Sequence, residues 1–328
     1  MANSSPEFEL IKRHFTRPAA NAVLGVGDDC ALVDVTNGMD LAVSMDTMVS
    51  GTHFFPDVNP ENLGHKALAV NLSDMAAMGA SPKWALLAGA LPDADPAWLE
   101  AFAHGFFALA AANDVDVVGG DTTSGPLNLC VTLLGEVPEG EAITRAGAKA
   151  GDSIYVSGVL GEAALAVAAL RGGIALDATA LAACKRRLEW PAPRLALGQR
   201  LRGVASAMLD VSDGLTGDLG HILKASHVGA TLDLAAMPVP PVIADLLHGS
   251  QRALALDCLL AGGDDYELCF TAPPVAASRM EEIARESGVP VTRIGTVTAS
   301  HRLIVNDERG TPLARVPRGF DHFARSAP

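Results

Sequence analysis

Apolar runs of two lengths alternate along the first half of the chain and predict alternating strands and helices. Residues 41–49 form a short apolar run of strand length, whereas residues 59–79 carry apolar positions at helical spacing between an Asn-Pro start and a Gly stop. The other expected elements of this half are a strand at 83–92, a long helix at 96–115, and strands at 115–121 and 127–137. The pattern predicts a domain of mixed strands and helices.

A polar stretch, "PEGEAITRAGAKAGD" at 138–152, interrupts this pattern, and the alternation then starts again. Expected strands of the second half lie at 153–158, 205–212, 229–235, 266–273, 291–297 and 301–307, and expected helices at 161–173, 193–203, 214–226 and 278–288. Elements of both kinds indicate an α/β (α+β) fold. A length of 328 residues suits two domains of about 150 residues each, which we place at 1–138 and 139–328.

Composition narrows the classes of function. The net charge of −14 argues against a general nucleic-acid binder, because phosphate backbones would be repelled, and suits a protein that gathers divalent metals or a cationic substrate. No segment has the apolar length of a signal peptide or a membrane span, so we expect a cytoplasmic protein without a membrane partner. The five cysteines are widely spaced and form no CxxC pair, which favours reduced thiols over disulfides or a zinc site.

Strands repeatedly end in clusters of Gly or Ser with Asp, as in "LGVGDDC", "AVSMDT", "VVGGDTT", "AMLDVSDG" and "LAGGDDYE". Any one of these clusters alone is most simply a solvated turn. Asp46 and Asp210, however, follow directly out of apolar runs, where an unpaired carboxylate would be costly. Carboxylate oxygens are the ligands that Mg²⁺ prefers, and no His/Cys set has transition-metal spacing. The clusters therefore indicate magnesium chemistry.

The usual nucleotide-binding and hydrolase signatures are missing. The chain has no G-x-x-x-x-G-K-[ST], no GxSxG and no HExxH, and "GVGDDC" places Cys30 where a dinucleotide fingerprint needs its third glycine. Of the nine histidines, only His53 lies in sequence beside the acidic clusters. A phosphate-binding loop of the common kind is therefore not expected.

A set of motifs in order resembles the thiamine-monophosphate kinase family: "GVGDDCAL", "SMDTMVSGTHF", "KALAVNLSDMAAMGA", "VVGGDTTSGP", "TRAGAKAGD", "DVSDGL", "GGDDYELCF" and "GFDHF". The resemblance runs from about Phe8 to Phe323. It implies a two-domain fold like that of aminoimidazole ribonucleotide synthetase, with strands of the N-terminal domain forming a barrel across a homodimer. It also implies ATP- and Mg²⁺-dependent phosphorylation of thiamine monophosphate to thiamine diphosphate, the last step of thiamine diphosphate biosynthesis.

The resemblance carries the family's functional residues onto this chain. The implied metal ligands are Asp29, Ser44, Met45, Asp46, Asp74, Asp121, Asp210 and Asp213. The implied ATP-binding residues are Gly120, Asp121, Arg145 and Ser212, and the implied thiamine-phosphate residues are His53, Asp264 and Phe320. Met45 stands where relatives have threonine, so its contact would use the backbone oxygen. Asp264 replaces a glutamate, so the charge is kept but the side chain has a shorter reach. Phe320 replaces a tyrosine or tryptophan, so it keeps a π-face without the polar tip.

The expected reaction is direct in-line phosphoryl transfer with several Mg²⁺ ions held by the aspartates. No covalent nucleophile or general base is expected, because the attacking phosphate oxygen of thiamine monophosphate is already anionic. Asp264 is expected to face the cationic thiazolium ring, and Asp265 and Glu267 to face solvent.

Two alternatives stay open: another ATP-dependent synthetase of the same superfamily, and a noncatalytic protein that binds divalent metals. A selenophosphate synthetase would need a reactive cysteine or selenocysteine near the N-terminus, but the first cysteine is Cys30, inside an acidic motif. Release of ADP with thiamine monophosphate, tested against other acceptors, separates these functions.

Overall fold

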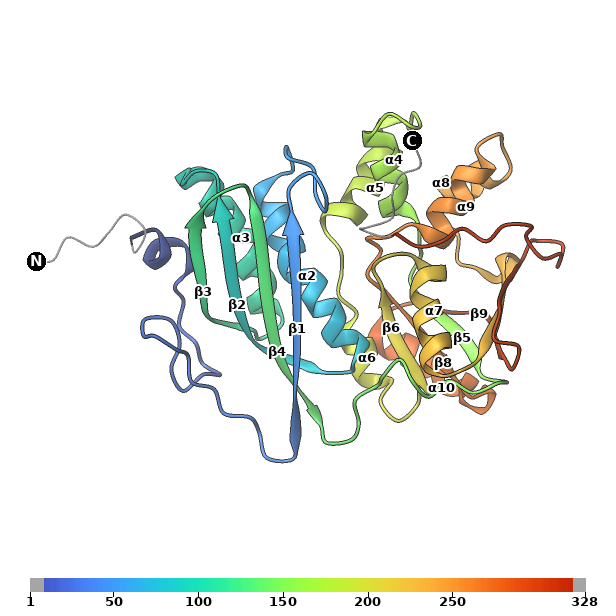
Figure 1. Ribbon diagram of the computed structural model, residues 1–328, viewed down its shortest axis with the longest axis horizontal. Coiled ribbons are helices and arrows are strands. Elements are labelled where there is room, and N and C mark those ends of the chain that lie inside the picture. The colour runs from blue at the N-terminus through green and yellow to red at the C-terminus, as the bar shows by residue number, and fades with distance from the viewer. Residues whose placement is uncertain (1–8, 321–328) are drawn as a thin grey trace, which may run out of the picture. The chain divides into compact units, whose positions relative to one another are not determined.

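The computed structural model describes residues 9–320, so the last three residues of the "GFDHF" motif lie outside the described part of the chain. The chain divides into two compact units (Figure 1). The N-terminal unit consists of Met1–Met75 with Ala80–Gly140, and the C-terminal unit consists of Ala76–Gly79 with Glu141–Pro328. The following paragraphs describe each unit by itself.

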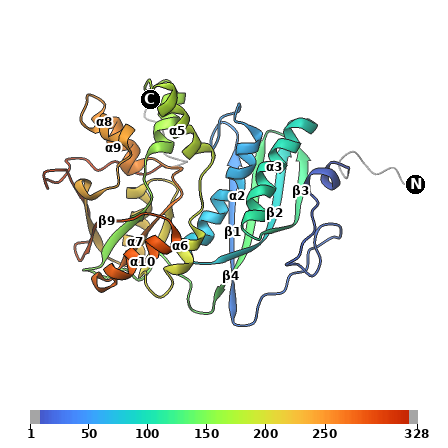
Figure 2. The same ribbon diagram turned by 180° about the vertical axis from the view of Figure 1, so that it is seen from behind.

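The N-terminal unit is a four-stranded sheet with two long helices on one face (Figures 1 and 2). Its elements are the π-helix η1 (Ile11–Phe15), β1 (Met39–Val49), α2 (Pro60–Ala77), β2 (Ser81–Leu91), α3 (Pro96–Ala112), β3 (Asp116–Ser124) and β4 (Asn128–Pro138). The strand order is β1-β4-β2-β3, in which β4 runs antiparallel to both neighbours and β2 runs parallel to β3. The strands of the described residues form open sheets, and neither sheet closes into a barrel.

Two glycines allow the backbones of α2 and α3 to approach each other closely. A Cβ atom on Gly64 would lie 2.0 Å from the carbonyl oxygen of Phe102, and one on Gly105 would lie 1.9 Å from the carbonyl oxygen of Glu61. Helix α3 begins where Asp95 accepts a hydrogen bond from the N–H of Ala97, and Pro96 occupies its first position. Residues 63–73 of α2 are all buried, and α2 and α3 lie on the same face of the sheet (Figure 2).

Strand β1 divides its side chains between the two faces of the sheet. Its even-numbered residues from Ala42 to Met48 point toward the helices, whereas Leu41, Val43 and Met45 are exposed on the other face. Val43 and Met45 are 60% and 64% exposed, although both are apolar. One face of this edge strand is thus an exposed apolar row.

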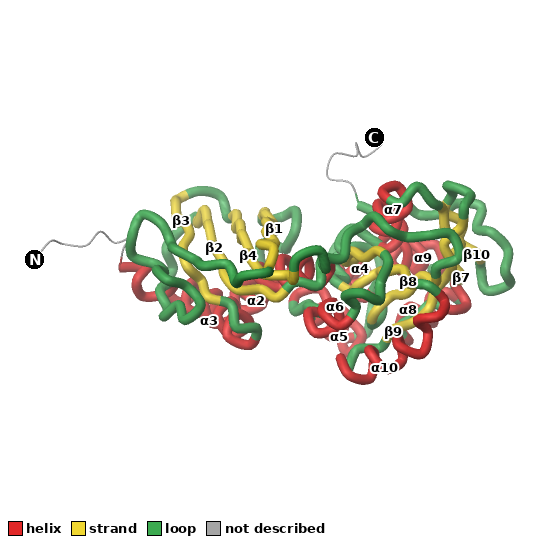
Figure 3. The backbone as a smooth tube through the Cα atoms, turned by 90° about the horizontal axis from the view of Figure 1, so that it is seen from below, coloured by secondary structure: helices red, strands yellow, loops and turns green. Residues whose placement is uncertain are grey.

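The C-terminal unit is built on a six-stranded sheet of order β10-β7-β9-β5-β8-β6. Its strands are β5 (Ser153–Ser157), β6 (Ala207–Val211), β7 (Gly229–Asp233), β8 (Glu267–Ala272), β9 (Val291–Thr298) and β10 (Leu303–Asn306). Its helices are α4 (Glu162–Leu170), α5 (Ala178–Glu189), α6 (Leu195–Arg200), α7 (Leu215–Ala225), α8 (Pro241–Leu247), α9 (Arg252–Ala261) and α10 (Ala277–Ser287), with short 3₁₀ turns η2 (Leu234–Ala236) and η3 (Pro274–Ala276). Figure 3 shows α7 and α10 on opposite sides of this sheet. Every residue of β5, β6 and β8 is buried, so these strands form the core.

The expected mixed α/β architecture in two parts is confirmed, with three additions. Helices α5, α8 and α9 were not among the expected elements. Pro240 and Pro241 begin α8 in a segment that reads as a proline-rich loop, because proline is tolerated at the first turn of a helix. None of the helices in residues 9–320 has the length and apolar character needed to span a membrane.

Candidate active site

The residues expected to act together are divided between the two units. The N-terminal unit carries Asp29, Ser44, Met45, Asp46, His53, Asp74, Gly120 and Asp121. The C-terminal unit carries Arg145, Asp210, Ser212, Asp213, Asp264 and Phe320. Each group is therefore described within its own unit.

In the N-terminal unit, β1 and α2 bring two of the expected metal ligands together. The hydroxyl of Ser44 donates a hydrogen bond to Oδ2 of Asp74. Asp46, two residues along β1, lies on the same helix-facing side as Ser44, whereas Met45 points to the exposed face. Met45 can therefore serve a ligand in this group only through its backbone oxygen.

A buried amide oxygen lies one helical turn before Asp74. Asn71 is fully buried, and its Nδ2 donates to the carbonyl oxygen of Ala67 at 3.2 Å. Its Oδ1 accepts no hydrogen bond within the described part of the chain. A buried acceptor left unpaired costs about 1–3 kcal/mol, so this oxygen is suited to a water molecule or other donor from outside the chain. Helical spacing places Asn71 on the same face of α2 as Asp74.

A cavity of about 1240 Å³ is lined by two more of the expected metal ligands of this unit. Its lining includes Asp29, from the loop that follows Gly27, and the pair Gly120–Asp121 of β3. Gly120 has φ 151°, and a Cβ atom there would lie 1.8 Å from the carbonyl oxygen of Leu87 on the neighbouring strand. Glycine is therefore required at this point of the cavity wall.

His53 lies in the turn after β1. Its Nδ1 accepts a 2.9 Å hydrogen bond from the N–H of Val49, so a neutral ring carries its proton on Nε2. This contact holds the ring at the end of β1.

In the C-terminal unit, the turn after β6 is held by a buried carboxylate that sequence reasoning missed. Asp210 lies within the buried strand β6, and Ser212 and Asp213 follow it. Oδ2 of Asp218, in the first turn of α7, accepts hydrogen bonds from the N–H groups of Asp213 and Gly214, both at 3.0 Å. Burial raises the pKa of Asp218 to about 7, although these hydrogen bonds act in the opposite direction. The available signal was an Asp in the first turn of the expected helix.

Two backbone hydrogen bonds bring four of the expected residues together. The N–H of Asp264 donates to the carbonyl oxygen of Ser212 at 2.8 Å, and the N–H of Phe320 donates to that of Asp213 at 2.9 Å. The turn after β6 is thus hydrogen-bonded to two other segments. One is the loop that follows α9, and the other is the segment that ends at Phe320. Arg145 lies in the 139–152 segment, where its carbonyl oxygen accepts from Ser226 at 3.2 Å.

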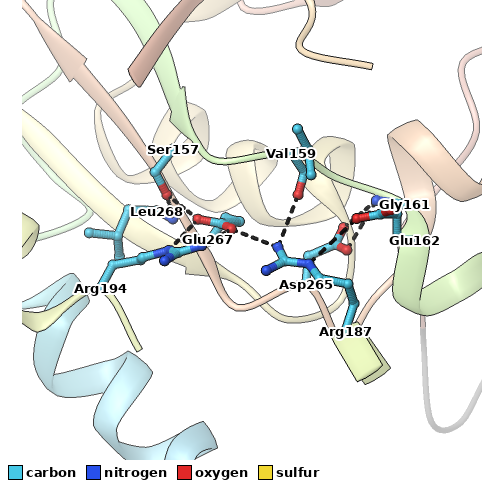
Figure 4. Close-up of polar contacts among 9 residues, drawn as sticks. All are labelled: Ser157, Val159, Gly161, Glu162, Arg187, Arg194, Asp265, Glu267 and Leu268. Carbon is cyan, nitrogen blue, oxygen red and sulfur yellow. Dashed lines mark hydrogen bonds and ion pairs between the residues drawn. The ribbon is translucent and has the colours of Figure 1, made fainter. Parts of the chain in front are cut away.

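The expectation that Asp265 and Glu267 face solvent is wrong. Asp265 is 5% exposed and Glu267 is fully buried. Glu267 receives hydrogen bonds from Arg187 (2.7 Å) and from Nε of Arg194 (2.7 Å), and from the hydroxyl of Ser157 (Figure 4). The chain turns back into the core after Asp264, and two arginines distant in sequence neutralise the buried carboxylate.

The two oxygens of Asp265 both accept from the N–H of Gly161, at 3.0 and 2.8 Å. Burial raises the pKa of Asp265 well above the ordinary value, which the Gly161 hydrogen bonds and Arg187 oppose only in part. Of the three carboxylates in this acidic loop, Asp265 and Glu267 are therefore structural.

The donor set fits Mg²⁺ shared with a nucleotide. The expected ligands offer hard oxygen atoms, to which Asn71 adds a buried oxygen without a hydrogen-bond donor in residues 9–320. Among those residues, no three His, Cys, Asp or Glu side chains converge into a ready-made metal cage. Mg²⁺ is commonly bound by one or two carboxylates together with substrate phosphates, so a complete protein cage is not required.

Comparison with known proteins assigns the family. The AIR synthase related protein N-terminal domain matches residues 27–137, and the corresponding C-terminal domain matches residues 149–308. The thiamine-monophosphate kinase of Escherichia coli is 46% identical over 325 residues, covering 97% of this chain and 98% of that relative. The chain belongs to the thiamine-monophosphate kinase family.

Solved structures of the thiamine-monophosphate kinase family have the same fold. The enzyme from Stenotrophomonas maltophilia matches with a TM-score of 0.83 and 43% identity, covering 93% of this chain and 96% of that one. A structure described as AaThiL complexed with AMPPCP and TMP matches with a TM-score of 0.75 and 29% identity, covering 96% of each chain. The resemblance read from the sequence motifs is confirmed at the level of family.

Proposed function

We propose that this protein is a thiamine-monophosphate kinase that transfers the terminal phosphoryl group of ATP to thiamine monophosphate. The observation that carries the proposal is the similarity to the Escherichia coli kinase over nearly the full length of both chains. The AaThiL complex supports both substrates, because AMPPCP is an analogue of ATP. The products are ADP and thiamine diphosphate.

The transfer is direct and in line. A terminal phosphate oxygen of thiamine monophosphate attacks the γ-phosphorus of ATP, a new P–O bond forms, and the bond from that phosphorus to the β–γ bridging oxygen breaks, which releases ADP. The attacking oxygen is already anionic, so no general base is needed. Bound Mg²⁺ would supply neutralisation of the phosphate charges, and Asp29, Asp46, Asp74 and Asp210 are the carboxylates that would hold it.

Nucleotide and acceptor are assigned to different residues. Gly120, Asp121, Arg145 and Ser212 would bind ATP, and the guanidinium of Arg145 can form paired hydrogen bonds to phosphate oxygens. His53, Asp264 and Phe320 would bind thiamine monophosphate. The exposed ring of Phe320 offers a π-face to the thiazolium cation, and the Asp264 carboxylate offers it a negative charge.

We also propose that a second copy of the chain covers the exposed face of β1. The support is the apolar row that includes Leu41, Val43 and Met45 on an edge strand, which would be unfavourable in contact with water. A barrel formed by strands of two copies is the arrangement that the family resemblance implies. The cytoplasmic location expected from the sequence stays a prediction.

A coupled assay of ADP release tests the function. The purified protein is given ATP and Mg²⁺ with thiamine monophosphate, thiamine or another phosphate acceptor, and thiamine diphosphate is identified by mass. The expected result is ADP formed together with thiamine diphosphate. ADP with another acceptor only would favour a different activity of the superfamily, and metal binding without turnover would favour a noncatalytic protein. Stoichiometric ³²P-labelling of the protein by γ-labelled ATP would contradict direct transfer.

A further inference from the structure

The acidic loop at 262–267 has a strained backbone at two positions. Asp264 has φ 67° and Tyr266 has φ 50°, in the left-handed region that residues other than glycine rarely adopt. Such conformations persist where the surroundings fix them, and they concentrate at functional sites. The loop is therefore held in one particular shape.

Backbone contacts on both sides of the loop impose this shape. The N–H of Asp264 donates to the carbonyl oxygen of Ser212, and the N–H of Tyr266 donates to that of Val211, both at 2.8 Å. A Cβ atom on Gly263 would lie 2.4 Å from the Ser212 oxygen, so the chain presses directly on the end of β6. The loop follows the turn after β6 and cannot shift independently of it.

Two buried side chains of the loop also attach it to the core of the C-terminal unit. The Asp265 carboxylate is held by the N–H of Gly161, and the Glu267 carboxylate by Arg187 and Arg194 (Figure 4). The two strained residues, Asp264 and Tyr266, therefore lie immediately before and after the buried Asp265. Their side chains are brought close to each other.

The hydroxyl of Tyr266 donates a 3.2 Å hydrogen bond to Oδ1 of Asp264. We propose that Tyr266 is a positioning residue that orients the Asp264 carboxylate toward the cationic ring of the phosphate-ester substrate. This proposal rests on the proposed function and adds a specificity-determining residue to it. The phenol holds one carboxylate oxygen and so sets the orientation of the whole carboxylate.

The physical gain is preorganisation. Loss of this hydrogen bond would widen the range of orientations open to the Asp264 carboxylate, and substrate binding would have to restrict it again. Removing the phenol oxygen leaves the charge of Asp264 in place but loosens its direction. We expect Tyr266→Phe to raise KM for thiamine monophosphate by roughly three- to ten-fold, the range for a lost hydrogen bond of ordinary strength. The KM for ATP and the melting temperature should change little.

The chain offers a matched control, because it has only two tyrosines. Tyr155 is buried in β5 and stacks on Phe270 of β8 at a ring-centroid distance of 5.4 Å. Tyr155→Phe removes the same atom from the same residue type. Steady-state kinetics and thermal melts are measured for the wild type, Tyr266→Phe, Tyr155→Phe and Asp264→Asn.

A neutral analogue isolates the electrostatic part of the effect. The probe is the monophosphate of 3-deazathiamine, whose five-membered ring lacks the positive charge, measured as a competitive inhibitor. The wild type should prefer thiamine monophosphate over this analogue. The preference should shrink in Tyr266→Phe and in Asp264→Asn, and should be unchanged in Tyr155→Phe.

The outcomes separate the two proposals. Wild-type turnover with an unchanged KM and an unchanged charge preference in Tyr266→Phe would overturn the positioning role alone. A lower melting temperature in Tyr266→Phe with wild-type kinetics would also overturn it, because the hydrogen bond would then serve stability only. If the wild type fails to phosphorylate thiamine monophosphate, the proposed function and this proposal both fall.

Discussion

The carbonyl oxygen of Asp213 accepts a 2.9 Å hydrogen bond from the N–H of Phe320. This contact joins a residue expected to bind metal to the aromatic residue expected to bind the thiamine rings, 107 positions later in the chain (320 minus 213). The approach is close because Gly319 has no side chain: a Cβ atom there would lie 2.9 Å from the same oxygen. The position of the aromatic ring therefore depends on the turn after β6.

Phe320→Ala should weaken binding of thiamine monophosphate without affecting ATP. A cation against an aromatic face contributes about 0.5–2 kcal/mol, so KM for thiamine monophosphate should rise roughly three- to thirty-fold. Phe320→Trp keeps the π-face and should retain or improve the wild-type value. Steady-state kinetics with each substrate varied in turn provide the measurement. Equal losses for both substrates, or a lower melting temperature with wild-type kinetics, would mean that Phe320 only packs.

Asp46→Asn and Asp210→Asn should each lower turnover by a factor of roughly a hundred or more while the protein stays folded. An amide keeps the size of the side chain but loses the charge that we expect to bind Mg²⁺ and to offset the phosphates. The measurement is kcat over a Mg²⁺ titration, with a thermal melt of each variant. Asp40→Asn, at an exposed position of the same strand β1 as Asp46, is the matched control. Near-normal turnover of either test variant at saturating Mg²⁺ would show that its carboxylate is structural.

Local sequence pattern predicted most strands and the long helices, because each of these elements is specified by residues within itself. The apolar run of β1 and the capped start of α3 are examples. Helix α8 was missed because Pro240 and Pro241 suggest a loop, and the packing that favours a helix there is non-local.

Which carboxylates of the acidic loop are buried could not be predicted from the residues of the loop itself. Arg187 and Arg194 lie 80 and 73 positions from Glu267, so the sequence near the carboxylate contains no sign of its partners. Asp264, Asp265 and Glu267 look alike as a cluster, and only the fold distinguishes the partly exposed Asp264 from the two buried carboxylates. The same holds for Asn71, which reads as a polar position of a helix and is fully buried.

Glu267→Gln should destabilise the protein strongly. The change leaves Arg187 and Arg194 without their buried countercharge, and breaking a buried ion pair costs about 3–5 kcal/mol. Glu308→Gln is the control, because Glu308 pairs with Arg252 at 2.7 Å on the surface, where such a pair contributes about 0–1 kcal/mol. Chemical denaturation gives both unfolding free energies. Similar small losses in the two variants would contradict a structural role for the buried network.

Asp265→Asn should remove a dependence of stability on pH. Burial raises the pKa of Asp265 in the folded protein above the value of 3.8 expected for an exposed aspartate. The folded state therefore binds this proton more tightly than the unfolded state, so the stabilisation is complete below pH 3.8 and is lost as the pH rises toward the folded pKa. Asparagine keeps an oxygen for the N–H of Gly161 and does not titrate in this range.

The measurement for this last prediction is the unfolding free energy of the wild type and of Asp265→Asn between pH 4 and pH 8, at constant ionic strength. Other carboxylates contribute to both proteins, so the difference between the two curves isolates Asp265. The wild type should lose stability relative to the variant as the pH rises. Asp245→Asn, at an exposed position of α8, corrects for the loss of one negative charge from an acidic protein. A difference that grows in the opposite direction would mean that the hydrogen bonds from Gly161 and the charge of Arg187 outweigh burial, and that Asp265 is held as a carboxylate.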